Sequence, residues 1–264
     1  MRLRVPNVTK KRRKKKILLL GLLTATLLIA LALTLALTVF RPQAVALYYE
    51  IRSFFLVRPD SAYRHYEDTD GKIVIWLDAG HGGTDPGAVS AFLNGETEAS
   101  INYRLTRLVK RELEALGYTV RLGWDDDSPT ENGQYPLAYR LDRINADPEA
   151  DFVIWIHCNS FTDPTVSGGR IYYLPETSRY THYLCESVAD RIEEAHAGER
   201  PRLYPLTNET AYKMLKGVSV PSFLIETLFV SHEGDAAKLL DPEWLETEAR
   251  GIAAGIRAFV DGAS

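Results

Sequence analysis

The sequence contains little cysteine, no internal repeat and no low-complexity tract. Two cysteines in 264 residues, Cys158 and Cys185, are too few for a disulfide-stapled small protein, and their spacing does not require a disulfide. We therefore expect both to be buried thiols. Hydrophobic residues make up 45% and charged residues 25% of the chain, which excludes a disordered tail or a collagen-like protein.

Basic charge is scarce beyond the first 40 residues. Residues 1–40 contain nine Lys or Arg and no acid, which leaves 22 basic against 35 acidic residues in 41–264. Phosphate contacts need clustered Lys and Arg, so we do not expect this acidic body to bind nucleic acid. The basic run KKRRKKK lies directly before a long apolar stretch, which favours membrane insertion over a nuclear-localisation or nucleic-acid patch.

Residues 17–40 form an uncharged stretch of 24 residues. As a helix it would be about 36 Å long, enough to cross a hydrocarbon core of roughly 30 Å. We expect a basic cytoplasmic arm at 1–16, a transmembrane anchor at 17–40 and a juxtamembrane connector at 41–71, with the remainder outside the cytoplasm. The alternative is a secretory signal cleaved near Ala46, within an A-x-A pattern.

From residue 72 onward, strand-like and helix-like patterns alternate. Short apolar runs predict strands at 73–77, 118–122, 152–156, 171–174 and 222–225. Helical periodicity and helix-boundary residues predict helices at 99–116, 136–146, 180–196 and 244–260. This alternation indicates a single α/β domain over 72–264 with a largely parallel sheet.

Three predicted strands are followed by residues that suit metal binding or acid–base chemistry. His81 lies in a glycine-rich loop after the first strand, His157 directly follows strand 152–156, and Glu226 directly follows strand 222–225. In open α/β sheets, functional residues gather beyond the carboxyl ends of the strands. Each residue alone would more often be structural, but their convergence on one edge predicts a functional site.

The two histidines supply two of the three protein ligands that a catalytic zinc ion needs. Candidates for the third are Glu96 and Glu98, at the start of the helix after the glycine-rich loop. Alternation along the strand puts His157 and Asn159 on one face and Cys158 on the other, which argues against a thiolate ligand. The chain has no HExxH motif, which excludes a thermolysin-type zinc helix.

Four segments occur in the order and spacing of a known family. They are DAGHGGTDPGA (78–88), the G-x-x-E-x-x-x-N spacing of 95–102, ADFVIWIHCNS (150–160) and VPSFLIETLFVS (220–231). Together they resemble the zinc-dependent N-acetylmuramoyl-L-alanine amidases with a type 3 catalytic domain. The resemblance implies one zinc ion held by His81, Glu98 and His157, and it favours Glu98 because Asn102 then takes the family's asparagine position.

The same resemblance implies the fold and the reaction. The expected fold is a mixed, mostly parallel sheet flanked by helices. The expected reaction is hydrolysis of the amide between N-acetylmuramic acid and L-alanine in peptidoglycan, by a zinc-bound water with Glu226 as general base. Asn159 and Arg140 are candidate substrate-binding residues.

Two alternative functions remain open. One is a zinc peptidase that cuts within the stem peptide of the cell wall. The other is a membrane-tethered peptidoglycan-binding regulator without activity, against which the four intact site residues argue.

Some positions depart from the family pattern or have two interpretations. Leu122, Gly123 and Trp124 stand where a Thr-Arg pair often follows the second strand, and His232 replaces a common asparagine. In some relatives a helix blocks the site until a protein activator displaces it. The helix at 180–196 could play that regulatory part, but we favour a packing helix.

Overall fold

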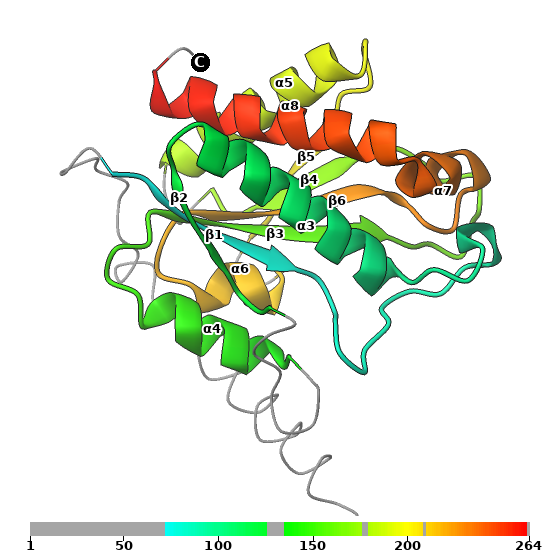
Figure 1. Ribbon diagram of the computed structural model, residues 1–264, viewed down its shortest axis with the longest axis horizontal. Coiled ribbons are helices and arrows are strands. Elements are labelled where there is room, and N and C mark those ends of the chain that lie inside the picture. The colour runs from blue at the N-terminus through cyan, green and yellow to red at the C-terminus, as the bar shows by residue number, and fades with distance from the viewer. Residues whose placement is uncertain (1–71, 126–134, 176–178, 208–209, 263–264) are drawn as a thin grey trace, which may run out of the picture. The chain divides into compact units, whose positions relative to one another are not determined.

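The computed structural model describes residues 72–125, 135–175, 179–207 and 210–262 (Figure 1). The predicted arm, anchor and connector lie outside these ranges and stay predictions. Within the ranges, no helix has the length and apolar character needed to cross a membrane.

Six strands form one mixed sheet in the order β2-β1-β3-β6-β4-β5. The strands are β1 (Val74–Ala79), β2 (Thr119–Leu122), β3 (Phe152–Asn159), β4 (Arg170–Tyr173), β5 (Arg202–Pro205) and β6 (Ser222–Phe229). All neighbouring pairs are parallel except β4 with β6, which is antiparallel. The predicted mixed, mostly parallel sheet is confirmed. The four-residue strand β5 was not predicted, because it has no continuous apolar run.

Helices cover both faces of the sheet (Figure 1). One face carries α3 (Glu98–Ala115), α5 (Arg179–Ala195) and α8 (Pro242–Val260), and the other carries α4 (Leu137–Asn145) and α6 (Lys213–Gly217). The 3-10 turn η2 (Ala91–Leu93) precedes α3, and α7 (Glu233–Leu240) follows β6. The short elements α6 and α7 were not predicted from sequence.

Alternate side chains of β3 enter two different cores. Ile154, Ile156 and Cys158 pack under α3, α5 and α8, whereas Val153 and Trp155 pack toward α4 and α6. By the same alternation, the side chain of His157 lies on the face of Val153 and Trp155. Both cysteines are buried free thiols, as expected.

Helix α5 packs against α8 over the first of these cores. The two helices approach closely because α8 has glycines at the contact: a Cβ on Gly255 would lie 2.4 Å from the Cα of Val188. This core lies on one face of the sheet, and His157 lies on the opposite face. Helix α5 corresponds to the helix predicted at 180–196. Its place in this core agrees with a packing helix, and it does not cover the sheet face that carries His157.

Strands β3 and β6 are longer than the sequence predicted. The apolar runs end at residues 156 and 225, but the strands continue to Asn159 and Phe229. His157 and Glu226 therefore lie within strands rather than after them, and they are opposite each other in the β3–β6 register. The prediction was short because strand pairing uses backbone groups and tolerates polar side chains where a face is open.

Candidate metal and catalytic site

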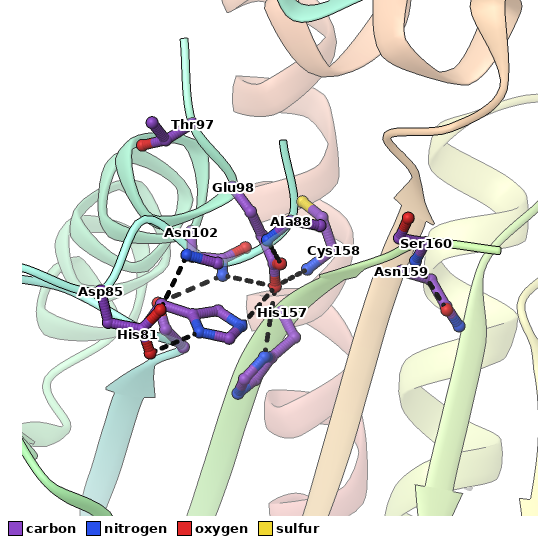
Figure 2. Close-up of polar contacts among 12 residues, drawn as sticks. His81, Asp85, Ala88, Thr97, Glu98, Asn102, His157, Cys158, Asn159 and Ser160 are labelled. Carbon is purple, nitrogen blue, oxygen red and sulfur yellow. Dashed lines mark hydrogen bonds and ion pairs between the residues drawn. The ribbon is translucent and has the colours of Figure 1, made fainter. Parts of the chain in front are cut away.

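Glu98 lies between His81 and His157 (Figure 2). Its Oε1 is 3.1 Å from His81 Nε2 and 3.3 Å from His157 Nδ1, and one ligand atom from each residue lies within 4.8 Å of the others. Ligands bound tetrahedrally to zinc at about 2.0–2.1 Å stand roughly 3.3 Å apart. The donor types and their spacing therefore fit a tetrahedral metal ion such as zinc.

The loop after β1 fixes the orientation of His81. His81 has a left-handed backbone with φ of 64°, and the glycines that follow it also have positive φ values. Asp85 Oδ2 lies 2.9 Å from His81 Nδ1, which leaves Nε2 directed to Glu98. Such a carboxylate behind a ligating histidine fixes the ring and its tautomer. Sequence reasoning missed Asp85, although its i+4 position in the same loop is a usable signal.

Helix α3 begins at Glu98 and so places this carboxylate at its N-terminus, where the helix dipole favours negative charge. Glu98 Oε2 accepts a hydrogen bond from Ala88 N–H at 2.7 Å. Oε1 accepts from Asn102 Nδ2 at 3.2 Å and from Cys158 N–H at 3.3 Å. Burial alone would raise the pKa of Glu98, but the hydrogen bonds from His157, His81 and Ala88 hold it far below the ordinary value.

The alternative ligand, Glu96, lies outside this cluster. Its carboxylate forms an ion pair with Arg104 and is partly exposed. The structure thus brings together the three predicted ligands and leaves Glu96 in a surface pair. A separation of two residues near a helix start is enough to send one carboxylate inward and the other outward.

The ring of His157 packs over the backbone of Gly80. Gly80 N–H donates to the carbonyl of Ile156 at 2.8 Å, so β1 and β3 remain paired up to the site. A Cβ on Gly80 would lie 2.4 Å from His157 Nδ1. The close approach requires glycine at this position.

Replacing Gly80 with alanine is expected to displace the His157 ring and weaken metal binding at least about 10-fold, comparable to the loss of an orienting contact. Competition with a chelator measures this affinity. Gly234→Ala in α7 is the matched control, since its nearest added contact is the His232 side chain at 3.2 Å. Unchanged affinity in Gly80→Ala would contradict a positional role.

Arg140 is buried in α4 and holds the start of the His81 loop. Its Nη1 donates to Asp78 Oδ1 and to the Ala79 carbonyl, both at 2.6 Å, and Nη2 donates to the His81 carbonyl. Nε donates to the Tyr135 carbonyl at 2.7 Å. These donors point to backbone and Asp78, so the structure shows a positioning role, and the substrate contact of Arg140 stays a prediction.

Gly123 and Trp124, in the segment that departs from the family pattern, support the loop that carries His81. A Cβ on Gly123 would lie 1.9 Å from Asp78 Oδ2, so only glycine leaves room for the Asp78–Arg140 pair. Trp124 Nε1 donates to the Ala79 carbonyl at 2.6 Å. Its ring stacks on two tyrosine rings, with centroid distances of 4.9 and 4.4 Å. Sequence reasoning missed these supports because their partners are distant in the chain.

Replacing Arg140 with methionine is expected to lower the free energy of unfolding by about 3–5 kcal/mol, because Asp78 would remain as a buried charge without its partner. Burial already raises the pKa of Asp78, and Arg140 opposes that effect. Urea denaturation measures the loss. The double variant Asp78→Asn with Arg140→Met is expected to recover part of it, and a loss below about 1 kcal/mol in the single variant would contradict the prediction.

Glu226 projects from β6 beside His157 and is not one of the clustered ligands. Its Oε2 is buried and has no hydrogen-bond partner among the described residues. Burial, and then the charge of Glu98, raise the pKa of Glu226 to about 8, against the opposing charges of His81 and Arg170. A desolvated carboxylate of this kind is suited to accept and release a proton.

Asn159 and His232 have local structural contacts. Asn159 lies apart from the triad (Figure 2), and its Oδ1 accepts a hydrogen bond from Ser160 N–H at 2.8 Å. The β3–β6 register shifts between His157 and Asn159. His232 caps α7 by accepting from Asp235 N–H at 3.1 Å. The structure does not bring Asn159 to the triad, and its substrate contact stays a prediction.

Comparisons with known proteins agree with this site. A family model described as N-acetylmuramoyl-L-alanine amidase matches residues 75–258. The amidase AmiC of Neisseria meningitidis is 28% identical over 228 residues, which cover 71% of this chain and 53% of that protein. The endolysin of Bacillus phage SPP1 is 30% identical over 194 residues, covering 71% and 66%. The chain spans about half the length of the curated AmiC relatives that it matches.

Solved structures show the same fold. The CwlD amidase from Clostridioides difficile, in complex with the GerS lipoprotein, is 26% identical with a TM-score of 0.63, and the match covers 72% of this chain and 100% of that one. AmiC2 of Nostoc punctiforme is 27% identical with a TM-score of 0.62, covering 72% and 98%.

Proposed function

The chain belongs to the N-acetylmuramoyl-L-alanine amidase family, and we propose that it hydrolyses the amide bond between N-acetylmuramic acid and L-alanine in peptidoglycan. One observation carries the proposal: the clustered donors of His81, Glu98 and His157 lie beside the desolvated carboxylate of Glu226. Amide hydrolysis needs a group that polarises the carbonyl and a group that carries protons. This site offers both.

The proposed resident ion is zinc, held by one carboxylate and two imidazoles. When bound, zinc polarises the scissile carbonyl and makes a water molecule acidic enough to react near neutral pH. Asp85 holds the ring of His81, while Asn102 and two backbone N–H groups hold the carboxylate of Glu98. These contacts preorganise the ligands before substrate arrives.

Glu226 carries the protons in this proposal. It accepts a proton from the attacking water and then donates it to the nitrogen of L-alanine. This transfer is necessary because an amide nitrogen leaves poorly until it is protonated. Glu226 is buried and lies opposite His157 in the β3–β6 register, so one carboxylate beside the proposed metal site can take the proton as a base and return it as an acid.

The test uses the full-length protein, loaded with zinc and incubated with purified peptidoglycan. We expect new L-alanine amino termini and lactyl carboxylates by mass spectrometry, lost with a chelator and restored by zinc. New amino termini from other stem-peptide residues would instead show a peptidase that cuts within the stem. No product from zinc-loaded protein would contradict the amidase proposal.

We also propose that residues 17–40 anchor the chain in the cell membrane, with the catalytic domain outside the cytoplasm. The support is the uncharged 24-residue stretch and the basic run directly before it. N-terminal sequencing of the mature protein tests the anchor. A new terminus at Leu47 would show a secreted protein instead.

A further inference from the structure

One row of the sheet crosses three strands beside the proposed catalytic site. His157 of β3 is opposite Glu226 of β6, and Glu226 is opposite Arg170 of β4. Neighbouring strands lie about 4.8 Å apart, so Arg170 stands one strand beyond Glu226, on the side away from the histidine. The row therefore consists of the proposed metal ligand His157, the proposed proton carrier Glu226 and the cationic Arg170, in that order.

The three side chains project to the same face of the sheet. Opposite residues of paired strands share a face, and the flanking residues of β4 agree. Tyr172, two positions after Arg170, packs in the core toward α4 and α6, whereas Ile171 packs in the opposite core. Arg170 thus shares its face with Glu226, and its charge acts on that carboxylate.

The guanidinium of Arg170 is held by aromatic rings rather than by an acid. Its central carbon is 4.5 Å from the ring centroid of Phe229 and 5.6 Å from that of Tyr204. Nη1 donates to the hydroxyl of Tyr172 at 3.4 Å. Among the described residues, no carboxylate forms an ion pair with Arg170. The rings fix the planar group and leave N–H donors for a ligand.

The chemistry of the proposed substrate offers a carboxylate at the right place. On the leaving side of the scissile bond, L-alanine is followed by a D-glutamate linked through its side chain, whose α-carboxyl group is either free or amidated. Two residues span at most about 7 Å, which exceeds the step of about 4.8 Å between neighbouring strands. The carboxylate can therefore extend from a bond beside Glu226 to the guanidinium of Arg170. The muramic side offers no such group, since its lactyl carboxyl forms the scissile amide.

We propose that Arg170 binds the free α-carboxylate of the second stem-peptide residue and so makes the enzyme selective for unamidated stems. The inference rests on the proposed amidase function and adds a specificity-determining residue to it. A guanidinium pairs with a carboxylate through two parallel hydrogen bonds, and an amide can accept through only one oxygen. Amidation therefore removes both the charge and one acceptor.

The test compares two muropeptides that differ only in D-isoglutamate or D-isoglutamine at the second stem position. With the zinc-loaded, full-length protein, kcat/KM for the carboxylate substrate should exceed that for the amide about 10- to 100-fold, the range for hydrogen bonds to charged groups. Arg170→Met should lose this preference through a fall on the carboxylate substrate alone. Arg170→Lys should keep part of it.

A matched control removes the same charge one strand further from Glu226. Arg202 is exposed, lies opposite Arg170 in the β4–β5 register and forms no ion pair among the described residues. Arg202→Met should keep the wild-type preference. An equal effect of both variants would show general electrostatic attraction and overturn the assignment.

The remaining outcomes separate this inference from the proposed function. Equal cleavage of both substrates by the wild-type protein would overturn the role of Arg170 and leave the amidase intact. An equal loss on both substrates in Arg170→Met, with zinc content unchanged, would show that Arg170 acts through Glu226. Cleavage of neither substrate, nor of whole peptidoglycan, would contradict the amidase itself. The wild-type preference is informative even if Arg170→Met folds poorly.

Discussion

Replacing Glu226 with glutamine is expected to lower the amidase rate by about 10²–10⁴-fold, the usual contribution of a general acid–base group, or more. Glutamine keeps the shape of the side chain but cannot accept a proton from water. Because Glu226 lies outside the clustered ligands, zinc should remain bound. The measurement pairs the release of L-alanine amino termini with the zinc content of the same sample.

The control for this variant is Glu246→Gln. Glu246 is a partly exposed residue of α8, on the far face of the sheet, and pairs with surface arginines. It should leave turnover unchanged. Near wild-type turnover in Glu226→Gln would show that Glu226 is not the base, and loss of zinc would assign it to the metal site.

Replacing Glu98 with alanine is expected to reduce bound zinc from one ion per chain to nearly none and to reduce activity to background. Removing a direct ligand should weaken zinc binding by more than the 10- to 100-fold that is typical for the loss of an outer-shell contact. Ala88, Asn102 and the Cys158 backbone would also lose their acceptor, at about 1–3 kcal/mol of stability for each group left unsatisfied. Elemental analysis and thermal unfolding measure the two effects.

Glu96→Ala is the matched control for Glu98→Ala, since it removes the same group two positions earlier. It removes the partly exposed ion pair with Arg104 and the hydrogen bond from Ser100 Oγ at 3.3 Å. An exposed ion pair of this kind is worth about 1 kcal/mol or less. Zinc content and activity should stay at wild-type levels. Loss of zinc in Glu96→Ala with retention in Glu98→Ala would reverse the assignment.

Much of the site could be predicted because its residues follow recognisable local patterns. The apolar runs before His81, His157 and Glu226 marked three strands. Because functional residues gather beyond the carboxyl ends of strands in open α/β sheets, the three side chains were expected at one edge. Helix position alone could not choose between Glu96 and Glu98, because both lie near the start of α3. The family resemblance favoured Glu98, which the structure places with the two histidines. The choice depends on the rotation of the helix against the sheet, and packing sets that rotation.

The residues that hold the site in place could not be predicted from the sequence. Asp78 and Arg140 are 62 residues apart, and Trp124 reaches back 45 residues to the Ala79 carbonyl. No local period connects such pairs. Short elements such as β5 and α6 were missed for a related reason: four or five residues carry too little pattern to distinguish them from loops.

The sequence by itself determined the α/β class, the donor types at the proposed metal site and the contrast between a basic N-terminal segment and an acidic body. These follow from composition and from the periodicity with which side chains are buried. Only the tertiary structure decided how the Glu98 carboxylate is held between the two histidines, and that Arg170 stands one strand beyond Glu226. Both depend on strand register and helix packing between distant segments, which arise when the chain closes around its two cores.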